Sequence, residues 1–420
     1  MKRIISFLIM SIFMLIPAAQ GEDIYLAVDE AVAIALRDNS DILLKAEDVK
    51  KQRSNIDEAK ASLYPALDFT TNWMRSRSYY EKDFSYNTYQ FGLKQTLYSG
   101  GEIGNNIKYN EYTLEADKAI LDKTKLDTAS GVKKAFYTLL FARRYAGLNK
   151  AMLNNAVEHL DSTRFRYKNG HASESDMLAI RSSLDSVREG YESSLNDIAA
   201  TEALLNNYLR LDKDVKVIPR GEFIYKKEDA AYDAMLERAL KDRPEMRQYA
   251  NQELAAERSV DIAAADNKPT VSASWDYYSR SHGALGTAKN RSDYNMIGIT
   301  VSWPVFDGWL TKSKIEQANI DLKTVRITRD RAARDITLEL KNAYLSWKDA
   351  IMKINAARSA MEVYRDNLVS LKKKFKDGIV SSLDVQDGIL KYSISRFNNT
   401  QAVYDYLMAK NDLDKAMGDI

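Results

Sequence analysis

The 420-residue sequence contains no cysteine and only three histidines. The absence of cysteine excludes disulfides, thiol catalysis and thiolate metal sites. The histidines, His159, His171 and His282, are scattered along the chain, and we interpret them as surface residues. No nucleophile–base pairing, glycine-rich phosphate loop or metal-ligand spacing is visible. We therefore predict a protein that is not an enzyme and that has no cofactor, catalytic residue or metal site.

Proline is also scarce, with six in the whole chain. None lies between positions 66 and 218, and none follows position 304. Because proline breaks the interior of a helix, these two stretches leave room for unusually long helices. A helix over residues 102–169 would be roughly 100 Å long. That length is too great for one compact domain.

The apolar segment at the N-terminus differs from the rest of the chain. Lys2 and Arg3 precede the apolar run 4–16, and small residues close the segment 17–21. This layout is typical of a secretory signal peptide, which we expect over residues 1–21. A membrane anchor is the alternative, although the run is short for a membrane span. Removal of Lys2 and Arg3 leaves equal numbers of basic and acidic residues, so the charge gives no reason to expect a nucleic-acid partner.

After this segment the chain repeats itself. Residues 28–65 match the sequence 204 positions later, and residues 95–209 match the sequence 208 positions later, in both cases without a gap. Each repeat is much longer than a solenoid unit, so we predict one assembly built from two similar halves. We place the first repeat at 22–210, a linker at 211–231 and the second repeat at 232–420. The identities include Ala35 with Ala239, Pro65 with Pro269, Gly100 with Gly308, Gly170 with Gly378, Asp176 with Asp384 and Leu205 with Leu413.

The later part of each repeat carries a heptad pattern of apolar residues. A period of 3.5 residues that continues over several heptads is typical of a coiled coil. We predict two long helical hairpins, at 102–209 and 309–418, each with a glycine at its turn. In the first repeat, Thr128, Asn149 and Thr163 occupy heptad positions, which suggests a looser seam. The pattern in the second repeat consists of Ile336, Leu340, Ala343, Trp347, Ala350, Ile354, Ala357, Met361, Tyr364, Leu368, Leu371 and Phe375.

Two segments, at about 66–98 and 270–304, alternate with a period of two residues instead. Leu67, Phe69 and Trp73 alternate with polar residues, for example, and Leu93 and Leu97 continue the pattern. Such runs are typical of transmembrane β-strands, with a half-buried sheet in a soluble protein as the alternative. Each segment holds two strands. The smallest membrane barrels have about eight strands, and an open edge in lipid leaves backbone groups unsatisfied, so several chains must share one barrel.

Short motifs recur in the same order in both repeats. They are the strand-to-helix turns Tyr98-Ser99-Gly100-Gly101 and Phe306-Asp307-Gly308-Trp309, the hairpin tips 166–170 and 374–378, and a Ser-x-x-Asp pattern at Ser173 to Asp176 and at Ser381 to Asp384. Through these motifs nearly all of the chain after the leader resembles the outer membrane efflux protein family, the TolC-like channels.

The resemblance implies a mainly α fold with transmembrane β, internally duplicated, with long coiled-coil helical hairpins plus four β-strands per chain. Three chains would form a homotrimer, with a twelve-strand β-barrel in the cell outer membrane and a twelve-helix α-barrel tunnel that extends into the periplasm. The stretch 211–231 would lie in an equatorial belt. The implied function is the exit duct of a tripartite efflux or type I secretion system. Its partners would be a periplasmic adaptor (membrane fusion) protein, an inner-membrane transporter and outer membrane lipid.

The resemblance also places a gate at the periplasmic tips. Asp384 and Asp387 match the family's acidic constriction, and at a spacing of three they lie on one helix face. Three chains would then form a ring of carboxylates that favours cations. The alternative is that Asp384 caps its helix and Asp387 is solvated.

Closure of the tip is expected from Leu371, Phe375 and Val380. Some family members lock the tip with a tyrosine and an arginine at the positions of Phe375 and Val380, so that polar latch is absent here. The expected docking site for the adaptor consists of both tip loops: Gly170, His171, Ala172, Ser173, Gly378, Ile379, Val380 and Ser381.

The sequence leaves several functional questions open. Drug efflux, metal efflux and protein secretion use the same architecture, and the substrate is chosen by the pump. The partner pump and the conditions that open the tip are not encoded in any visible motif. A coiled-coil scaffold in the periplasm or on the cell surface, without a transport function, is the competing class.

Overall fold

The computed structural model describes residues 23–77, 84–170, 173–212, 215–221, 223, 225, 231–284, 290–377, 379–380 and 382–419. The expected signal peptide therefore lies outside the described residues. The chain divides into two compact units. Unit 1 contains the chain up to Asn39, Thr128–Lys227 and Lys348–Asn411, and unit 2 contains Ser40–Asp127, Glu228–Trp347 and Asp412–Ile420. Each unit includes parts of both repeats, so the repeats are units of sequence and not separate packing units.

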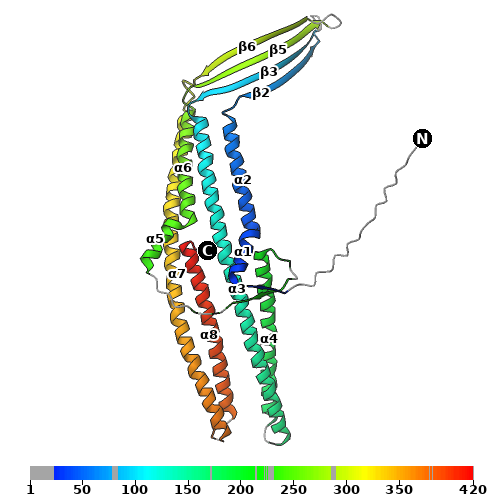
Figure 1. The fold of residues 1–420 in the computed structure, drawn as a ribbon, viewed down its shortest axis with the longest axis vertical. Helices are drawn as coiled ribbons and strands as arrows, with labels where there is room; N and C mark the ends of the chain where they lie inside the picture. Colours follow the sequence, from blue (N-terminus) through cyan, green and yellow to red (C-terminus); the bar gives the residue numbers. More distant parts are fainter. Residues whose placement is uncertain are drawn as a thin grey trace, which may run out of the picture. The chain divides into compact units, whose positions relative to one another are not determined.

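The two repeats form the same helices in the same order and with equal lengths (Figure 1). This match confirms the internal duplication and the two predicted helical hairpins. The corresponding helices are α1 (Val28–Asp38) and α5 (Tyr232–Asp242), both of 11 residues; α2 (Ser40–Ala61) and α6 (Pro244–Ala265), both of 22; α3 (Glu102–Lys168) and α7 (Leu310–Lys376), both of 67; and α4 (Glu174–Leu209) and α8 (Ser382–Met417), both of 36.

Four long strands form one antiparallel sheet in unit 2, in the order β2-β3-β5-β6. Their bounds are Ala66–Ser76, Phe84–Ser99, Thr270–Ala284 and Asn290–Ser302. The pairing of β3 with β5 joins the two repeats, and β2 and β6 are the edge strands. No described helix is both long enough and apolar enough to cross a membrane.

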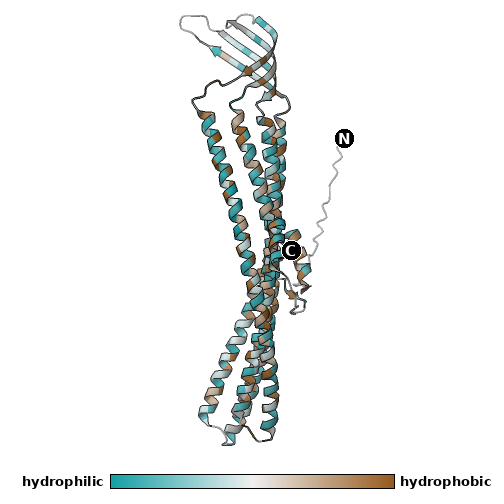
Figure 2. Ribbon diagram, turned by 90° about the vertical axis from the view of Figure 1, so that its left-hand side faces the viewer, coloured by the Kyte–Doolittle hydropathy of each residue, from teal (hydrophilic) through white to brown (hydrophobic). Residues whose placement is uncertain are grey.

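The register of the sheet places the predicted apolar residues on one face. Leu67 pairs with Leu93, which pairs with Trp275, and Trp275 pairs with Ile297. All four side chains are exposed in the chain, and apolar and polar residues alternate along the strands (Figure 2). A β-bulge between Thr96 and Tyr98 shifts the register at Leu97, whose side chain is exposed.

Unit 1 contains a small apolar core around α1. Helix α1 packs its buried face, which includes Val32 and Ala35, against the long helices α3 and α4. The short strands β1 (Ile24–Leu26) and β4 (Val217–Pro219) pair in parallel beside it. The buried members of this core are Leu26, Ala31, Val32, Ala35, Ala129, Val132, Ala135, Phe136, Leu139, Leu205, Leu209 and Val217.

The heptad seams are buried along most of their length but include exposed residues near the tips. Leu340, Trp347 and Ile354 are buried in the second repeat, whereas Tyr364 and, in the first repeat, Tyr167 are exposed. The three polar heptad residues of the first repeat are all buried and therefore lie within the seam. The amide nitrogen Nδ2 of Asn149 in α3 donates a hydrogen bond of 3.3 Å to the carbonyl oxygen of Gly190 in α4.

The two hairpins differ in which helix carries the larger side chain at one pair of corresponding positions. In the second hairpin, α8 presents Gly388, where an added Cβ would lie 2.7 Å from Cδ1 of Leu371 in α7. The corresponding positions of the first hairpin, 208 residues earlier, hold Ile180 and the buried Thr163. These positions therefore hold one large and one small residue in each hairpin, but the helix that supplies the large residue differs.

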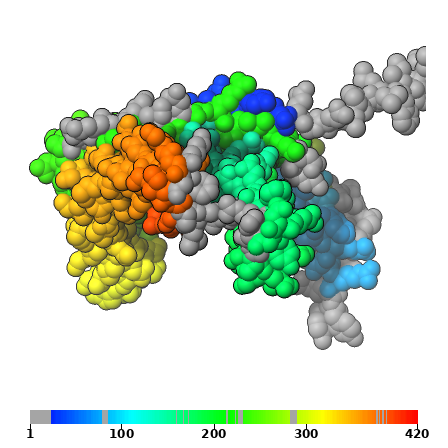
Figure 3. All heavy atoms as spheres, turned by 90° about the horizontal axis from the view of Figure 1, so that it is seen from below, coloured from blue at the N-terminus to red at the C-terminus, as the bar shows by residue number. Residues whose placement is uncertain are grey.

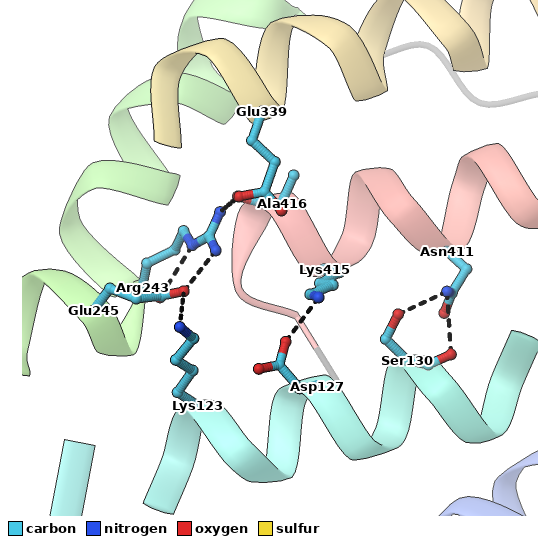
Figure 4. Close-up of polar contacts among 9 residues, drawn as sticks. All are labelled: Lys123, Asp127, Ser130, Arg243, Glu245, Glu339, Asn411, Lys415 and Ala416. Atoms are coloured by element: carbon cyan, nitrogen blue, oxygen red, sulfur yellow. Dashed lines mark hydrogen bonds and ion pairs between the residues drawn. The ribbon is translucent and has the colours of Figure 1, made fainter. Parts of the chain in front are cut away.

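The junction between α5 and α6 contains a buried ion cluster (Figure 4). Arg243 is buried and donates to both carboxylate oxygens of Glu245, at 2.7 and 3.2 Å, and to Glu339 at 2.6 Å. It also donates to the backbone oxygen of Ala416 at 3.5 Å, near the end of α8. In the first repeat the same junction holds Asn39, whose amide donates to the backbone oxygen of Tyr208 at 3.1 Å. In both repeats a side chain at this junction thus donates to a carbonyl oxygen in the last turn of α4 or α8, which has no partner within its own helix.

This cluster makes stability depend on pH. Burial raises the pKa of Glu245, but the hydrogen bonds and charge of Arg243 outweigh burial and hold that pKa below its ordinary value of 4.5. A carboxyl whose pKa is lower in the folded state contributes stability above its ordinary pKa. That contribution is lost as the pH falls through the lowered pKa.

We predict that Gly388→Ile destabilises the second hairpin and that Leu371→Thr restores it. The isoleucine overfills the space beside Leu371, which costs about 1–3 kcal/mol, while the double variant reproduces the pair found in the first hairpin. Thermal unfolding of the four proteins in a double-mutant cycle measures the coupling. If the stability changes of the two single variants simply add in the double variant, these side chains do not compete for the same space.

We also predict that Arg243→Met lowers the unfolding free energy by about 3 kcal/mol at neutral pH, because Glu245 loses the partner of its buried charge. The difference in unfolding free energy between variant and wild type should narrow as the pH falls from 4.5 through the lowered pKa of Glu245. Urea unfolding at pH 7 and over a series of pH values below 4.5 measures this difference. The control is Arg238→Met, which removes an exposed arginine from α5 and should change stability by less than about 1 kcal/mol. A difference in unfolding free energy that stays constant with pH would contradict the pairing of Arg243 with an ionised Glu245.

Candidate functional site at the hairpin tips

The tip of the first hairpin is built by backbone turns and one helix cap. Helix α3 ends at Lys168, and Gly170 adopts a positive φ of 74°, a conformation that favours glycine. Asn169 closes the last turn with hydrogen bonds from its backbone nitrogen and its Nδ2 to the carbonyl oxygen of Phe165. Of the other predicted docking residues in this loop, His171 and Ala172 lie outside the described residues.

Ser173 and Asp176 form a capping box at the start of α4. The hydroxyl of Ser173 accepts a hydrogen bond from the backbone nitrogen of Asp176 at 3.1 Å. In return the carboxylate of Asp176 accepts from the backbone nitrogen of Ser173 at 2.9 Å and from its hydroxyl at 2.7 Å. These hydrogen bonds from Ser173 hold the pKa of Asp176 below its ordinary value. The Ser-x-x-Asp pattern therefore fixes the point at which the chain leaves the tip and enters α4.

The tip of the second hairpin exposes an apolar loop. Helix α7 ends at Lys376, and the backbone nitrogen of Ile379 donates to the carbonyl oxygen of Lys374 at 2.9 Å. The side chain of Ile379 is exposed and that of Val380 is half-buried. Gly378 and Ser381, which belong to the predicted docking site, lie outside the described residues. Figure 3 looks onto the tips of the two hairpins of unit 1 from below.

Both predicted constriction residues lie on α8 with exposed side chains. Asp384 is in the first helical turn, and Asp387 follows it on the same side of the helix. The carboxylate of Asp387 forms an ion pair of 2.7 Å with Lys391 one turn later. The hydrogen bond to Asp387 and its charge raise the pKa of Lys391. The acidic pair therefore has a cation beside it, which partly offsets its negative charge.

Lys391 and Gly388 were missed in the sequence reasoning, although Lys391 had a readable signal. An acidic residue four positions before a lysine is a common helical ion pair, and Asp387 and Lys391 have that spacing. Gly388 had no such signal, because only the facing helix shows that its missing side chain makes room for Leu371.

The three predicted closure residues are described to different extents. Leu371 is half-buried in the contact between α7 and α8, next to Gly388. Val380 is half-buried as well. The side chain of Phe375 lies outside the described part of the chain. In the described residues, no three His, Asp or Glu side chains come together as a metal site.

A family model supports the resemblance over most of the chain. The model described as "Outer membrane efflux protein" matches residues 31–209 and 235–419. These two segments correspond to the two repeats.

Individual relatives are similar at low identity over most of their length. The chain is 21% identical to outer membrane protein TolC of Escherichia coli over 402 residues, which cover 90% of this chain and 80% of TolC. It is 20% identical to the alkaline protease secretion protein AprF of Pseudomonas aeruginosa, over 83% of this chain and 76% of AprF. The solved structure of the Campylobacter jejuni CmeC outer membrane channel is similar with a TM-score of 0.81 and 16% identity, over 93% of this chain and 85% of CmeC.

The family match extends over both repeats. The structure has two long helical hairpins and a sheet with one exposed apolar face. The chain belongs to the outer membrane efflux protein family, whose members are outer membrane channels with a periplasmic helical tunnel and are not enzymes.

Proposed function

We propose that three copies of this chain form a passive exit duct that is gated at the hairpin tips. The observation that carries the proposal is the four-stranded sheet. One of its faces is apolar and exposed, and its edge strands β2 and β6 have no partner strand among the described residues. A sheet with open edges is stable in lipid only when other chains complete it. Three chains would supply twelve strands for an outer membrane barrel, and their hairpins would form a twelve-helix tunnel into the periplasm.

The duct receives its substrate from an inner-membrane transporter through a periplasmic adaptor. Two kinds of relatives support this role, since AprF is named for protease secretion and other relatives are named for efflux. The adaptor docks on the two tip loops, where Gly170 and the exposed Ile379 are available for contact. The substrate class follows from the transporter that the duct serves.

The gate combines an acidic ring with apolar closure. Asp384 and Asp387 from three chains surround the axis and favour cations, while Lys391 reduces their negative charge. Leu371, Phe375 and Val380 close the tip by apolar packing, because neither of the last two can form a polar latch. We therefore expect a lower barrier to opening than in relatives that have the latch.

We predict a small, cation-preferring single-channel conductance in a planar bilayer. Asp384→Ala/Asp387→Ala should abolish the cation preference, and Lys391→Ala should increase it, because the carboxylate then loses its neighbouring positive charge. Asp366→Ala is the control, since it removes an exposed carboxylate from α7 that pairs with Arg365. The reversal potential in a salt gradient measures the preference. An unchanged preference in the double variant would exclude these residues from the constriction, and failure of a folded trimer to insert would favour the scaffold function.

We further predict that Val380→Arg lowers the leak conductance of the closed duct, because it supplies the cation of the missing latch. The matched control is Ile379→Arg, which adds the same charge to the adjacent exposed position. Conductance at low voltage measures the leak. An equal decrease in both variants would show that added charge, and not a latch at position 380, reduces the leak.

A further inference from the structure

Helix α7 has two apolar stripes on opposite sides. One is the buried heptad seam that contains Leu340, Trp347 and Ile354. The other lies about half a turn away and recurs at steps of seven and eleven residues, which return to the same side of a helix. It is exposed throughout and consists of Ile320, Ile327, Leu338, Leu345, Met352 and Val363. A helix with apolar residues on two sides is expected to pack on both.

The corresponding face of α3 is covered within the chain. Ala119 corresponds to Ile327 and is 2% exposed, against 56% for Ile327. Ser130 corresponds to Leu338 and is 7% exposed, against 61%. The described segments that cover this face of α3 are α8 in unit 1 and α6 in unit 2, as the contacts below show. The described residues leave the second stripe of α7 exposed, although Tyr232 and Leu240 of α5 lie beside Leu338.

Three contacts define how α3 packs on these neighbours, two of them visible in Figure 4. In unit 1, Nδ2 of Asn411 in α8 donates to the hydroxyl of Ser130 at 2.8 Å. Farther along the same helices, the rings of Tyr145 and Phe397 pack at 5.2 Å between centroids. In unit 2, Lys123 of α3 and Glu245 of α6 form an ion pair of 3.9 Å.

We propose that the second stripe of α7 packs against α2 and α4 of a second copy of this chain, in the register in which α3 packs against α6 and α8. The proposal rests on the trimer of the proposed function and assigns the faces and residue pairs that hold it together. The repeat supplies the argument: α7 corresponds to α3, α4 to α8 and α2 to α6. On the side of the second stripe, α3 is covered by α8 and α6. Among the described residues α7 contacts α8, α6 and α5, and these contacts leave its second stripe exposed, so a neighbouring copy is needed to complete the arrangement.

Each contact of α3 can be transferred by replacing both residues with their counterparts in the other repeat, and the resulting pairs are chemically complementary. Tyr145 and Phe397 correspond in this way to Lys353 and Glu189, which have opposite charges. Lys123 and Glu245 become Arg331 and Asp41, which keep both signs. All four side chains are exposed in the single chain.

The tightest transferred contact joins an apolar residue to a small one. Ser130 and Asn411 become Leu338 and Ala203, both exposed. The short contact between the first pair indicates close backbones, and a disulfide requires Cα atoms within about 7 Å. Two ion pairs of α3 do not transfer as charge pairs. Arg247 and Asp122 correspond to Leu43 and Asp330. Lys415 and Asp127 correspond to Asn207 and Asp335. Leu43 is exposed and apolar, so it adds to the surface that would meet α7.

Disulfide trapping tests the register, and the natural chain contains no cysteine that could interfere. We expect Leu338→Cys/Ala203→Cys to give disulfide-linked dimers and trimers on non-reducing gels of membranes oxidised with copper phenanthroline. Each single variant should stay monomeric on the same gel. The control for non-specific linkage is Arg358→Cys/Ala203→Cys, in which the first cysteine is exposed on the opposite side of α7 and about 30 Å farther along it. Linked species in the control but not in the test pair would overturn the proposed face.

Charge exchange gives a second measurement that does not depend on disulfide geometry. Lys353→Glu and Glu189→Lys should each lower the temperature at which the native trimer dissociates in detergent, and the double variant should recover it. Native mass measurement separates the possible failures. A wild type that is monomeric would refute the trimer of the proposed function, whereas a trimer that forms without linkage or rescue would refute only this register.

Discussion

Side-by-side packing of neighbouring helices is the interaction on which the rest of the structure depends. The chain buries its apolar residues along narrow seams and in one small core around α1. Along a seam each helix contacts its neighbour through one residue per turn or less, so every contact must fit closely. A position such as Gly388, where an added Cβ would meet Leu371 at 2.7 Å, shows how little space remains.

Duplication explains both the likeness and the differences of the two halves. Corresponding helices of the two repeats have equal lengths. A shorter helix in one repeat would leave part of the helix packed beside it without a contact. The side chains between them diverged in compensating pairs. Thr163 with Ile180 corresponds to Leu371 with Gly388, and Asn39 beside Tyr208 corresponds to Arg243 beside Ala416.

The hairpin tips follow a different rule, since burial decreases toward them. There the backbone is held by local hydrogen bonds, such as the capping box of Ser173 and Asp176, and not by a core. Segments with few buried contacts open more readily than a packed core. A gate at the tips is consistent with that low local stability, and the ion pair between Asp387 and Lys391 sets the charge it would present.

The sequence by itself determined the order and length of the elements, the duplication and the apolar face of the sheet. These features depend on local periodicity, which fixes the residues that share one side of a helix or strand. Tertiary structure alone decided which sides meet. The heptad pattern could not show that Asn149 finds the carbonyl oxygen of Gly190, that Thr163 is buried, or that α3 is covered on the side where α7 is exposed. Those outcomes depend on complementary sizes and hydrogen-bond partners hundreds of residues away or on a facing helix, and no local pattern carries that information.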